Sequence, residues 1–254
     1  MFGWVGWTEE KGVPAVQTGE REVLRMRFCT VTIRRKGRAP AAILRRRCRR
    51  AARLLRRLGI TRAVFPEDFP FLSVFAQEEV RPAEALPMYR ALAAELVQAA
   101  LSARGSWGRE ATVAVCADQL TDEVRRAVTE LCIRNRYVLL DAPDRDGVFC
   151  RQLRREYGVP LSRAETAEQL DRAEVVVLFS ARAGVFSGQT VLELYAGGCL
   201  PEVLLEADGE EDLPDDGCRR QLLSALWAGG ALRPGQVRVR TWGRADKKEG
   251  KAAK

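Results

Sequence analysis

Four polar residues in the middle of the chain have side chains that could bind or act on a small molecule. Each follows a short apolar run that is typical of a buried strand. The carboxyl ends of neighbouring parallel strands lie at one edge of a sheet, so we expect these side chains to converge. Two carboxylates, a hydroxyl and a guanidinium suit a nucleotide or a sugar phosphate, bound without catalysis or with carboxylate-based catalysis. The four residues are Asp118, Asp141, Ser180 and Arg182.

A second candidate anion site lies in the loop that follows Arg182. Two glycines, Gly184 and Gly188, would let successive backbone N–H groups form an anion-binding nest. The loop does not match a phosphate-binding P-loop, because no lysine follows the second glycine. We therefore add Gly184 and Gly188 to the candidate cofactor-binding residues, with an ordinary connection between two elements as the alternative. The sequence gives no reason to expect a resident cofactor or a metal.

The chain contains no histidine, and this composition weakens the case for an enzyme. It rules out Ser-His-Asp and Cys-His activation of a nucleophile within one chain. It also removes the commonest general base near neutral pH and the commonest metal ligand. The composition therefore favours a non-enzymatic protein, with an enzyme based on carboxylates as the alternative.

The cysteine spacing and the hydropathy pattern indicate the cellular compartment. None of the seven cysteines forms a Cys-x-x-Cys pair, so neither a zinc site nor a disulfide framework is predicted, and buried thiols fit a reducing cytosol. No apolar stretch approaches the length of a membrane span. The first ten residues lack the basic and apolar regions of a secretory signal. We expect a cytoplasmic protein with no membrane partner.

The net charge of +8 is concentrated in one part of the chain. No acidic residue lies between Glu22 and Glu67, whereas that interval contains fifteen basic residues, and the rest of the chain is net acidic. Much of the basic charge falls on a predicted helix over 40–58. The apolar stripe of this helix has helical spacing, and arginines occupy the remaining surface. The stripe consists of Leu44, Cys48, Ala51, Leu55 and Leu58.

Three interpretations of this basic segment stay open. It could bind nucleic acid or an acidic protein through phosphate or carboxylate contacts. It could be a solvated face that reflects the arginine-rich composition of the whole chain. It could also pair with acidic surface in the same molecule or in a second copy, which would make a homo-oligomer. The segment carries no interleaved aromatic residues, so a base-stacking platform is not predicted. The candidate polyanion-binding residues are Arg34, Arg35, Lys36, Arg38, Arg45, Arg46, Arg49 and Arg53.

The order of elements predicts an α/β fold. Apolar runs over 112–115, 137–140 and 174–179 alternate with helical patterns over 121–134 and 148–157. Such alternation favours a mostly parallel sheet with helices on both faces, to which an antiparallel edge strand could be added near either terminus. We expect further strands at 15–17, 23–33, 60–65, 202–205 and 237–242, and further helices at 84–104, 189–196 and 218–228.

The segment 111–180 resembles the nucleotide-binding half of a Rossmann-type domain, with an acid, Asp141, after its second strand. In dinucleotide binders the first turn is G-x-G-x-x-G, and its glycines let the backbone approach the pyrophosphate. Here the turn is residues 116–122 and contains none of the three glycines. Asp118 and Asp122 add negative charge at the helix start, and Asp118 or Thr121 can cap it. A cap competes with a phosphate for the same N–H groups, so we expect a degenerate nucleotide-binding fold.

These patterns suggest an organisation and three functions. We expect an N-terminal α/β half over 1–107, a Rossmann-like half over 108–242 and a disordered charged tail over 243–254. The two halves could form one continuous domain. The favoured function is a non-enzymatic scaffold for ligand sensing or protein interaction. The alternatives are polyanion binding through 34–57 and a carboxylate-based enzyme acting on a nucleotide or a sugar phosphate.

Overall fold

The chain forms two compact units with α/β architecture. A computed structural model describes residues 1–10, 12–35, 37, 39–105, 110–144, 147–159, 161–164, 166–182, 188–233 and 235–242. Unit 1 comprises Met1–Ala85 and Ala207–Val237, and unit 2 comprises Leu86–Glu206 and Arg238–Lys254. The division expected near residue 107 stays a prediction. No helix in the described ranges is both long and apolar enough to cross a membrane.

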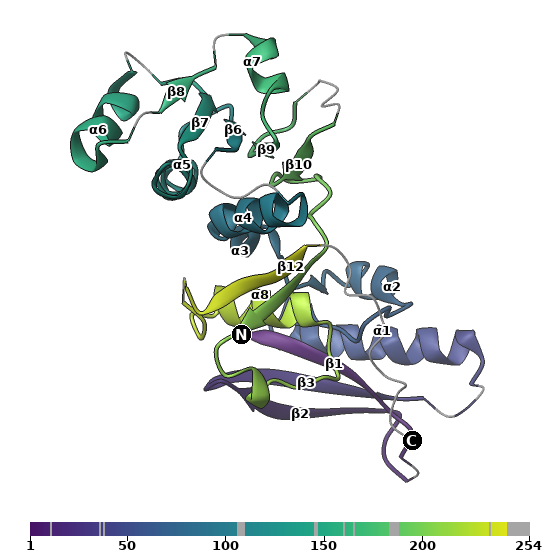
Figure 1. Cartoon of the computed structure of the whole chain (residues 1–254). Coiled ribbons are helices and arrows are strands. Elements are labelled where there is room, and N and C mark those ends of the chain that lie inside the picture. Colours follow the sequence, from purple (N-terminus) through teal and green to yellow (C-terminus); the bar gives the residue numbers. More distant parts are fainter. Residues whose placement is uncertain are drawn as a thin grey trace, which may run out of the picture. The chain divides into compact units, whose positions relative to one another are not determined.

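Unit 1 is built on a mixed sheet of five described strands in the order β2-β3-β1-β4-β5, of which β1, β2 and β3 are labelled in Figure 1. The edge strand β2 is antiparallel to β3, whereas β3, β1, β4 and β5 pair in parallel. The fold therefore includes the antiparallel edge strand that the sequence allowed. The strands are β1 (Phe2–Thr8), β2 (Val16–Val23), β3 (Met26–Arg34), β4 (Arg62–Val64) and β5 (Arg81–Pro82).

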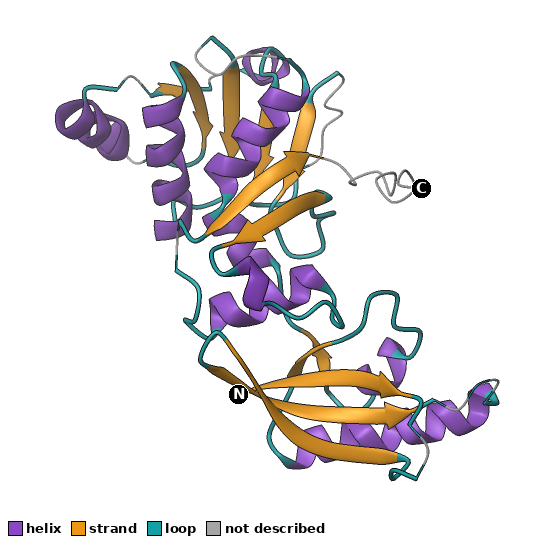
Figure 2. Cartoon of the chain, turned by 60° about the horizontal axis from the view of Figure 1, so that its bottom comes forward, coloured by secondary structure: helices purple, strands orange, loops and turns teal. Residues whose placement is uncertain are grey.

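Helices cover both faces of this sheet. Two of them, α1 (Ala41–Arg57) and α2 (Leu72–Ala76), pack on the face that presents Val31 and Phe65, and α1 lies alongside the long strands in Figure 2. The side chains of Trp4 and Val64 alternate to the opposite face. Gly217 lies so close to both of them that an added Cβ would approach each to 2.9 Å. The helix α8 (Arg219–Ala228), which follows this glycine, belongs to that second layer.

Two predictions in unit 1 were wrong. The run over 23–33 is not one strand, because Leu24 and Arg25 adopt positive φ values of 45° and 63° and form a hairpin turn between β2 and β3. Such a turn is usually signalled by Asn-Gly or Asp-Gly, and neither pair stands at residues 24–25. The sequence predicts no strand before residue 15, yet Phe2–Thr8 forms the central strand β1.

Unit 2 contains a parallel sheet of five described strands in the order β10-β9-β6-β7-β8. Every pairing in this sheet is parallel. Numbered by chain position, the order is 5-4-1-2-3, which is that of the first five strands of a Rossmann-type sheet. The predicted fold class is confirmed. The strands are β6 (Thr112–Cys116), β7 (Tyr137–Asp141), β8 (Ser162–Arg163), β9 (Val175–Leu178) and β10 (Thr190–Glu193).

Alternating residues of β6 and β9 face two helical layers. The fully buried Val115 and Val177 share one face, on which α4 packs against β9 and α5 against β7. Ala114 and Val176 share the other face with Leu170 of α7. This burial on both faces explains why the strands read as continuous apolar runs. The helices are α3 (Leu86–Ala91), α4 (Ala93–Ala103), α5 (Asp122–Arg134), α6 (Val148–Tyr157) and α7 (Ala167–Asp171).

The helical periodicity misled the prediction at two places in unit 2. The helix expected over 84–104 is interrupted at Leu92, which separates α3 from α4. The helix expected over 189–196 is the edge strand β10, which pairs with β9. This apolar run is too short for its periodicity to distinguish a helix from a strand. Pairing with the edge of the sheet makes it a strand. A separate two-stranded sheet pairs β11 (Val203–Ala207) with β12 (Val237–Trp242).

Candidate functional site

The candidate site of unit 2 lies at the carboxyl edge of the sheet, next to β6. The chain leaves β6 for β7 on one side and later returns to β9 on the other side. The connections therefore change direction at β6 and β9, and open α/β sheets bind their ligands at such a switch point. All four residues predicted from strand ends lie here, because β6, β7 and β9 end at the same level.

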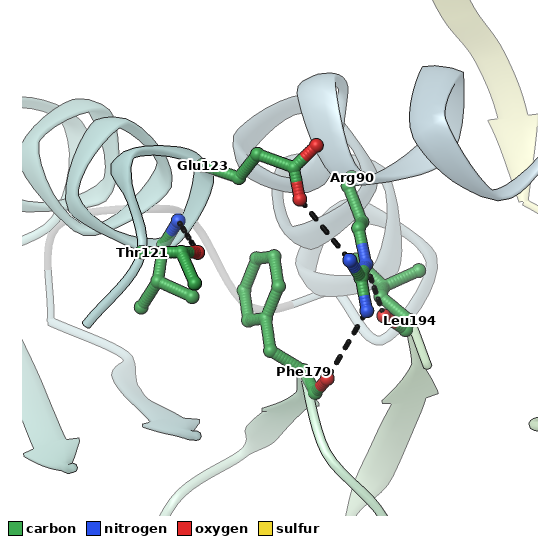
Figure 3. Close-up of polar contacts among 6 residues, drawn as sticks. Arg90, Thr121, Glu123, Phe179 and Leu194 are labelled. Atoms are coloured by element: carbon green, nitrogen blue, oxygen red, sulfur yellow. Dashed lines mark hydrogen bonds and ion pairs between the residues drawn. The ribbon is translucent and has the colours of Figure 1, made fainter. Parts of the chain in front are cut away.

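The turn after β6 is held by hydrogen bonds from within the chain. The Asp118 N–H donates to Ser180 Oγ at 2.7 Å, and the Ala117 N–H donates to the Asp141 carbonyl oxygen at 3.0 Å. Thr121 is the N-cap of α5, and its Oγ1 accepts a hydrogen bond from the Val124 N–H at 3.4 Å (Figure 3). Three backbone N–H groups at this turn and at the start of α5, those of Ala117, Asp118 and Val124, therefore have acceptors within the chain.

An ion pair spans the carboxyl end of β6. Arg182, beyond β9, pairs through its Nη1 with the carboxylate of Asp141, at the end of β7. Since β6 lies between these two strands, the pair crosses the end of β6 at Cys116. Burial raises the pKa of the Cys116 thiol, and the nearby Arg182 guanidinium opposes that rise. In a dinucleotide binder the acid after the second strand holds the ribose hydroxyls, whereas here its carboxylate is engaged by arginine.

Arg90 joins three elements beside this edge (Figure 3). Its Nε donates to the carbonyl oxygen of Leu194 at 2.8 Å and its Nη2 to that of Phe179 at 3.3 Å, just past β10 and β9. Its Nη1 lies 3.1 Å from a carboxylate oxygen of Glu123, in the first turn of α5. One guanidinium thus satisfies two backbone carbonyls and one acid, which fixes the position of α3 against the ends of the strands.

Of the two candidate glycines, Gly188 lies at the entry into β10. Gly184 lies outside the described residues. Gly188 is exposed with φ +77°, and its carbonyl oxygen accepts a hydrogen bond from Arg104 Nη2 at 3.0 Å. Arg104 also donates to Thr190 Oγ1 at 3.3 Å, so Gly188 belongs to the entry into β10. The structure therefore brings together Asp118 with Ser180 and Asp141 with Arg182, but not Gly188.

Asp144, which sequence reasoning missed, caps the start of α6. Its two carboxylate oxygens accept hydrogen bonds from the N–H groups of Phe149 and Cys150, each at 3.1 Å. Burial acts to raise the pKa of Asp144, but these hydrogen bonds prevail, and the pKa lies below its ordinary value. Asp144 lies three positions before Gly147, the N-cap of α6, so the usual N-cap preference for an acid does not point to it.

Arg90 was also missed, because it lies within a helical pattern that reads as core. It directly follows the buried Tyr89 in a segment rich in apolar residues. A lone arginine at the margin of such a stripe is the one available signal, and it does not identify the carbonyls that the guanidinium reaches. Within the described ranges, no group of three or more Cys, Asp and Glu residues could hold a metal ion.

The basic segment of unit 1 contains a continuous surface that we call the arginine face. Its side chains line a surface hollow of about 730 Å³ along α1, together with Ala42 and Leu54. Leu58, expected in the apolar stripe, is 58% exposed because α1 ends at Arg57, and Cys48, Ala51 and Leu55 of the stripe are buried. The arginine face consists of Arg45, Arg46, Arg49, Arg50, Arg53 and Arg57.

The other predicted polyanion residues lie away from the arginine face. Arg34 ends β3, and its Nη1 donates to the Val13 carbonyl oxygen at 2.6 Å, so its guanidinium is used internally. Arg35 is exposed beyond β3, while Lys36 and Arg38 lie outside the described residues. Arg50 and Arg57 were absent from the predicted set, although their helical spacing from Arg46 and Arg53 could have included them.

Comparisons with known proteins give no family. No protein-family model matches the chain, and no curated protein matches it. The L-tryptophan dehydrogenase of Nostoc punctiforme is 16% identical over 61% of this chain, with a TM-score of 0.29, and the chain spans 45% of that protein's length. A phosphoglycerate oxidoreductase of Vibrio cholerae O395 is 10% identical, with a TM-score of 0.30, over 91% of this chain and 82% of that one. The Rossmann-like character of unit 2 rests on its own strand order.

Proposed function

We propose that this protein works by binding and not by dinucleotide-dependent catalysis, with unit 2 as a Rossmann-like scaffold for ligand sensing or protein interaction. The hydrogen bond from the Asp118 N–H to Ser180 Oγ carries this proposal. It occupies a donor of the turn where a pyrophosphate would lie. The glycines that would give a phosphate access to the backbone are absent from 116–122.

One further contact and one feature of charge support the same conclusion. The Asp141 carboxylate, which would hold ribose hydroxyls, is paired with Arg182. The first turn of α5 carries Asp122 and Glu123, whose negative charges offset the positive end of the helix dipole. A bound dinucleotide would have to displace an ion pair and approach two acids, and each of these steps costs free energy.

The enzyme alternative receives less support from the same contacts. Carboxylate-based catalysis needs a free carboxylate near a second reactive group. The Asp141 carboxylate is engaged by Arg182, and the chain supplies no histidine to act beside it. Association between copies of the chain stays a prediction from the uneven charge.

Calorimetric titration with NAD, NADP, FAD and ATP tests the proposal. We expect no saturable heat with any of them at ligand concentrations up to about 1 mM, a range that reaches binding of about −4 kcal/mol. A dinucleotide-dependent dehydrogenase titrated in parallel shows that the ligands are active. Saturable binding of a dinucleotide to the wild-type chain, lost on Asp118→Pro, would overturn the proposal, because proline lacks the N–H group.

A further inference from the structure

The arginine face carries charge that the described part of the protein does not neutralise. Of its members, Arg53 pairs with Glu78 at 3.0 Å. The other members have no ion pair or hydrogen bond from their side chains to any described residue. Neighbouring like charges on one helix repel each other, which destabilises an isolated helix. The unpaired members are Arg45, Arg46, Arg49, Arg50 and Arg57.

Packing on the opposite side fixes the direction of this surface. Cys48, Ala51, Ala52 and Leu55 of α1 are fully buried against the sheet of unit 1. Rotation of the helix about its axis would expose these side chains, so their packing keeps the arginine face directed toward solvent. A pre-oriented set of charges loses less conformational entropy on binding than charges on a mobile segment.

The spacing of the arginines suits a regular row of phosphates. Arg45, Arg49, Arg53 and Arg57 recur every four residues, and this row extends over about 18 Å at a rise of about 1.5 Å per residue. One strand of a duplex presents a phosphate about every 3.4 Å along its axis, so the length of this row corresponds to that of about five phosphates. Every basic residue of α1 is arginine, whose planar guanidinium binds phosphate oxygens in pairs.

The residues that line the hollow distinguish among anionic partners. A protein interface needs a desolvated apolar or aromatic centre, and only Ala42 and Leu54 offer apolar side chains here. A binder of single strands needs aromatic side chains on which bases stack, and the hollow has none among its lining residues. Contacts to a duplex backbone need only correctly spaced cations.

We propose that the arginine face binds double-stranded nucleic acid through its phosphates, without reading the base sequence. This inference goes beyond the proposed function, since it concerns unit 1 and does not depend on how unit 2 treats nucleotides. Failure of either proposal leaves the other unaffected, because one is tested with a duplex and the other with free nucleotides.

Fluorescence anisotropy with a labelled DNA duplex of about 20 base pairs tests this inference. The test variant replaces Arg45, Arg46, Arg49 and Arg50 with glutamine. The control variant replaces four exposed arginines of unit 2 with glutamine and so removes the same total charge. These are Arg126, Arg154, Arg155 and Arg172. Circular dichroism establishes that both variants keep the helix content of the wild type.

The expected result has three parts. The wild type binds at about 50 mM salt and weakens at least tenfold by about 200 mM. The test variant binds at least about tenfold more weakly, with a salt slope shallower by about 3 to 4, because about 0.9 of a unit is lost per phosphate contact. The control variant stays within about twofold of the wild type, and scrambled duplexes bind equally well, which separates backbone contacts from base readout.

Several results would overturn the inference. No binding of duplex at low salt would do so, as would an equal loss in the test and control variants, which would indicate an effect of total charge. Tighter binding of a single strand than of the duplex would indicate a stacking site elsewhere. Competition by polyglutamate as strong as that by the duplex, at equal charge, would point to an acidic protein instead.

Discussion

Ser180 Oγ accepts a hydrogen bond from the Asp118 N–H across 62 residues of sequence, at a distance of 2.7 Å. This contact joins the loop after β9 to the turn after β6, which is the turn where a Rossmann-type domain receives a pyrophosphate. A side chain from the loop after β9 is therefore the acceptor for this backbone donor.

Replacing Ser180 with alanine removes this acceptor. We expect the free energy of unfolding of Ser180→Ala to fall by about 1 kcal/mol, the usual net value of one hydrogen bond. Urea denaturation followed by circular dichroism measures the change. Ser180→Thr keeps the hydroxyl and serves as the control. Equal stability of the alanine variant and the wild type would show that the hydrogen bond contributes nothing.

Arg90 stabilises unit 2 through three contacts of one guanidinium. Arg90→Gln cannot reach two carbonyls and Glu123 together, and we expect the free energy of unfolding to fall by about 2 kcal/mol. Arg90→Lys keeps the charge but not the fork, so it should recover only part of the loss. Thermal denaturation of the wild type, Arg90→Lys and Arg90→Gln gives their order of stability. A lysine variant as stable as the wild type would contradict the role of the fork.

The sequence predicts most of this fold but only part of the site. Continuous apolar runs such as 174–179 identify buried parallel strands. The ends of these runs in the sequence already place Asp141 and Ser180 at the carboxyl edge of the sheet. The hydrogen bond of Ser180 could not be predicted, because it depends on the contact of two loops that are 62 residues apart in the sequence. Arg90 likewise lies in a helix that precedes the sheet, and its carbonyl partners carry no side-chain signal.

Asp144 gives unit 2 a specific dependence on pH. Because hydrogen bonds to its carboxylate lower its pKa, the ionised form stabilises the folded state above the ordinary pKa of 3.8. That contribution is lost as the pH falls through the lower pKa of the folded protein. We expect Asp144→Asn to be less stable than the wild type at pH 7 by about 1 kcal/mol.

Urea denaturation at several pH values checks the sign of this effect. The difference between Asp144→Asn and the wild type should narrow progressively below pH 3.8, where both side chains become neutral. The variant Asp171→Asn, which alters an exposed acid at the end of α7, is the matched control. A difference that widens on acidification would show that the carboxylate is not the stabilising form.

The cysteines should differ strongly in reactivity. Burial raises the pKa of Cys48 and Cys132 to about 12, and burial together with Asp144 raises that of Cys150 to about 11. Thiols react as thiolates, so these three should resist alkylation in the native protein. Cys199 is exposed and should be labelled first. Mass spectrometry after brief treatment with iodoacetamide tests this order. In the protein unfolded in guanidinium chloride, all seven cysteines should be labelled.

The hairpin at Leu24 and Arg25 contains a removable strain. Arg25 has φ +63°, a conformation that costs a residue with a Cβ atom about 1 kcal/mol or more. We expect Arg25→Gly to raise the free energy of unfolding by about 0.5 to 1 kcal/mol, as measured in urea. Arg25→Ala keeps the Cβ and should give no gain. A glycine variant less stable than the alanine variant would mean that Arg25 makes a contact that outweighs the strain.

The same hairpin shows why some turns could not be predicted from the sequence. Turn residues announce a hairpin when they are glycine or asparagine, and the leucine and arginine at this turn read as a continuing strand. The arginine face, in contrast, could be predicted from the sequence. Helical spacing alone places Arg45 and Arg49 on one side of α1, and the burial of Cys48 opposite them follows from the same periodicity.

The backbone amide of Asp118 gives the most direct test of the central claim. Its resonance in an 15N-labelled protein can be assigned by comparison with Ser180→Ala, and its exchange with solvent and its chemical shift can be followed during addition of NAD. We predict a protected amide whose shift does not change with NAD up to about 1 mM, because Ser180 Oγ already accepts its hydrogen bond. An unprotected amide, or a saturable shift of this resonance with NAD, would contradict the account.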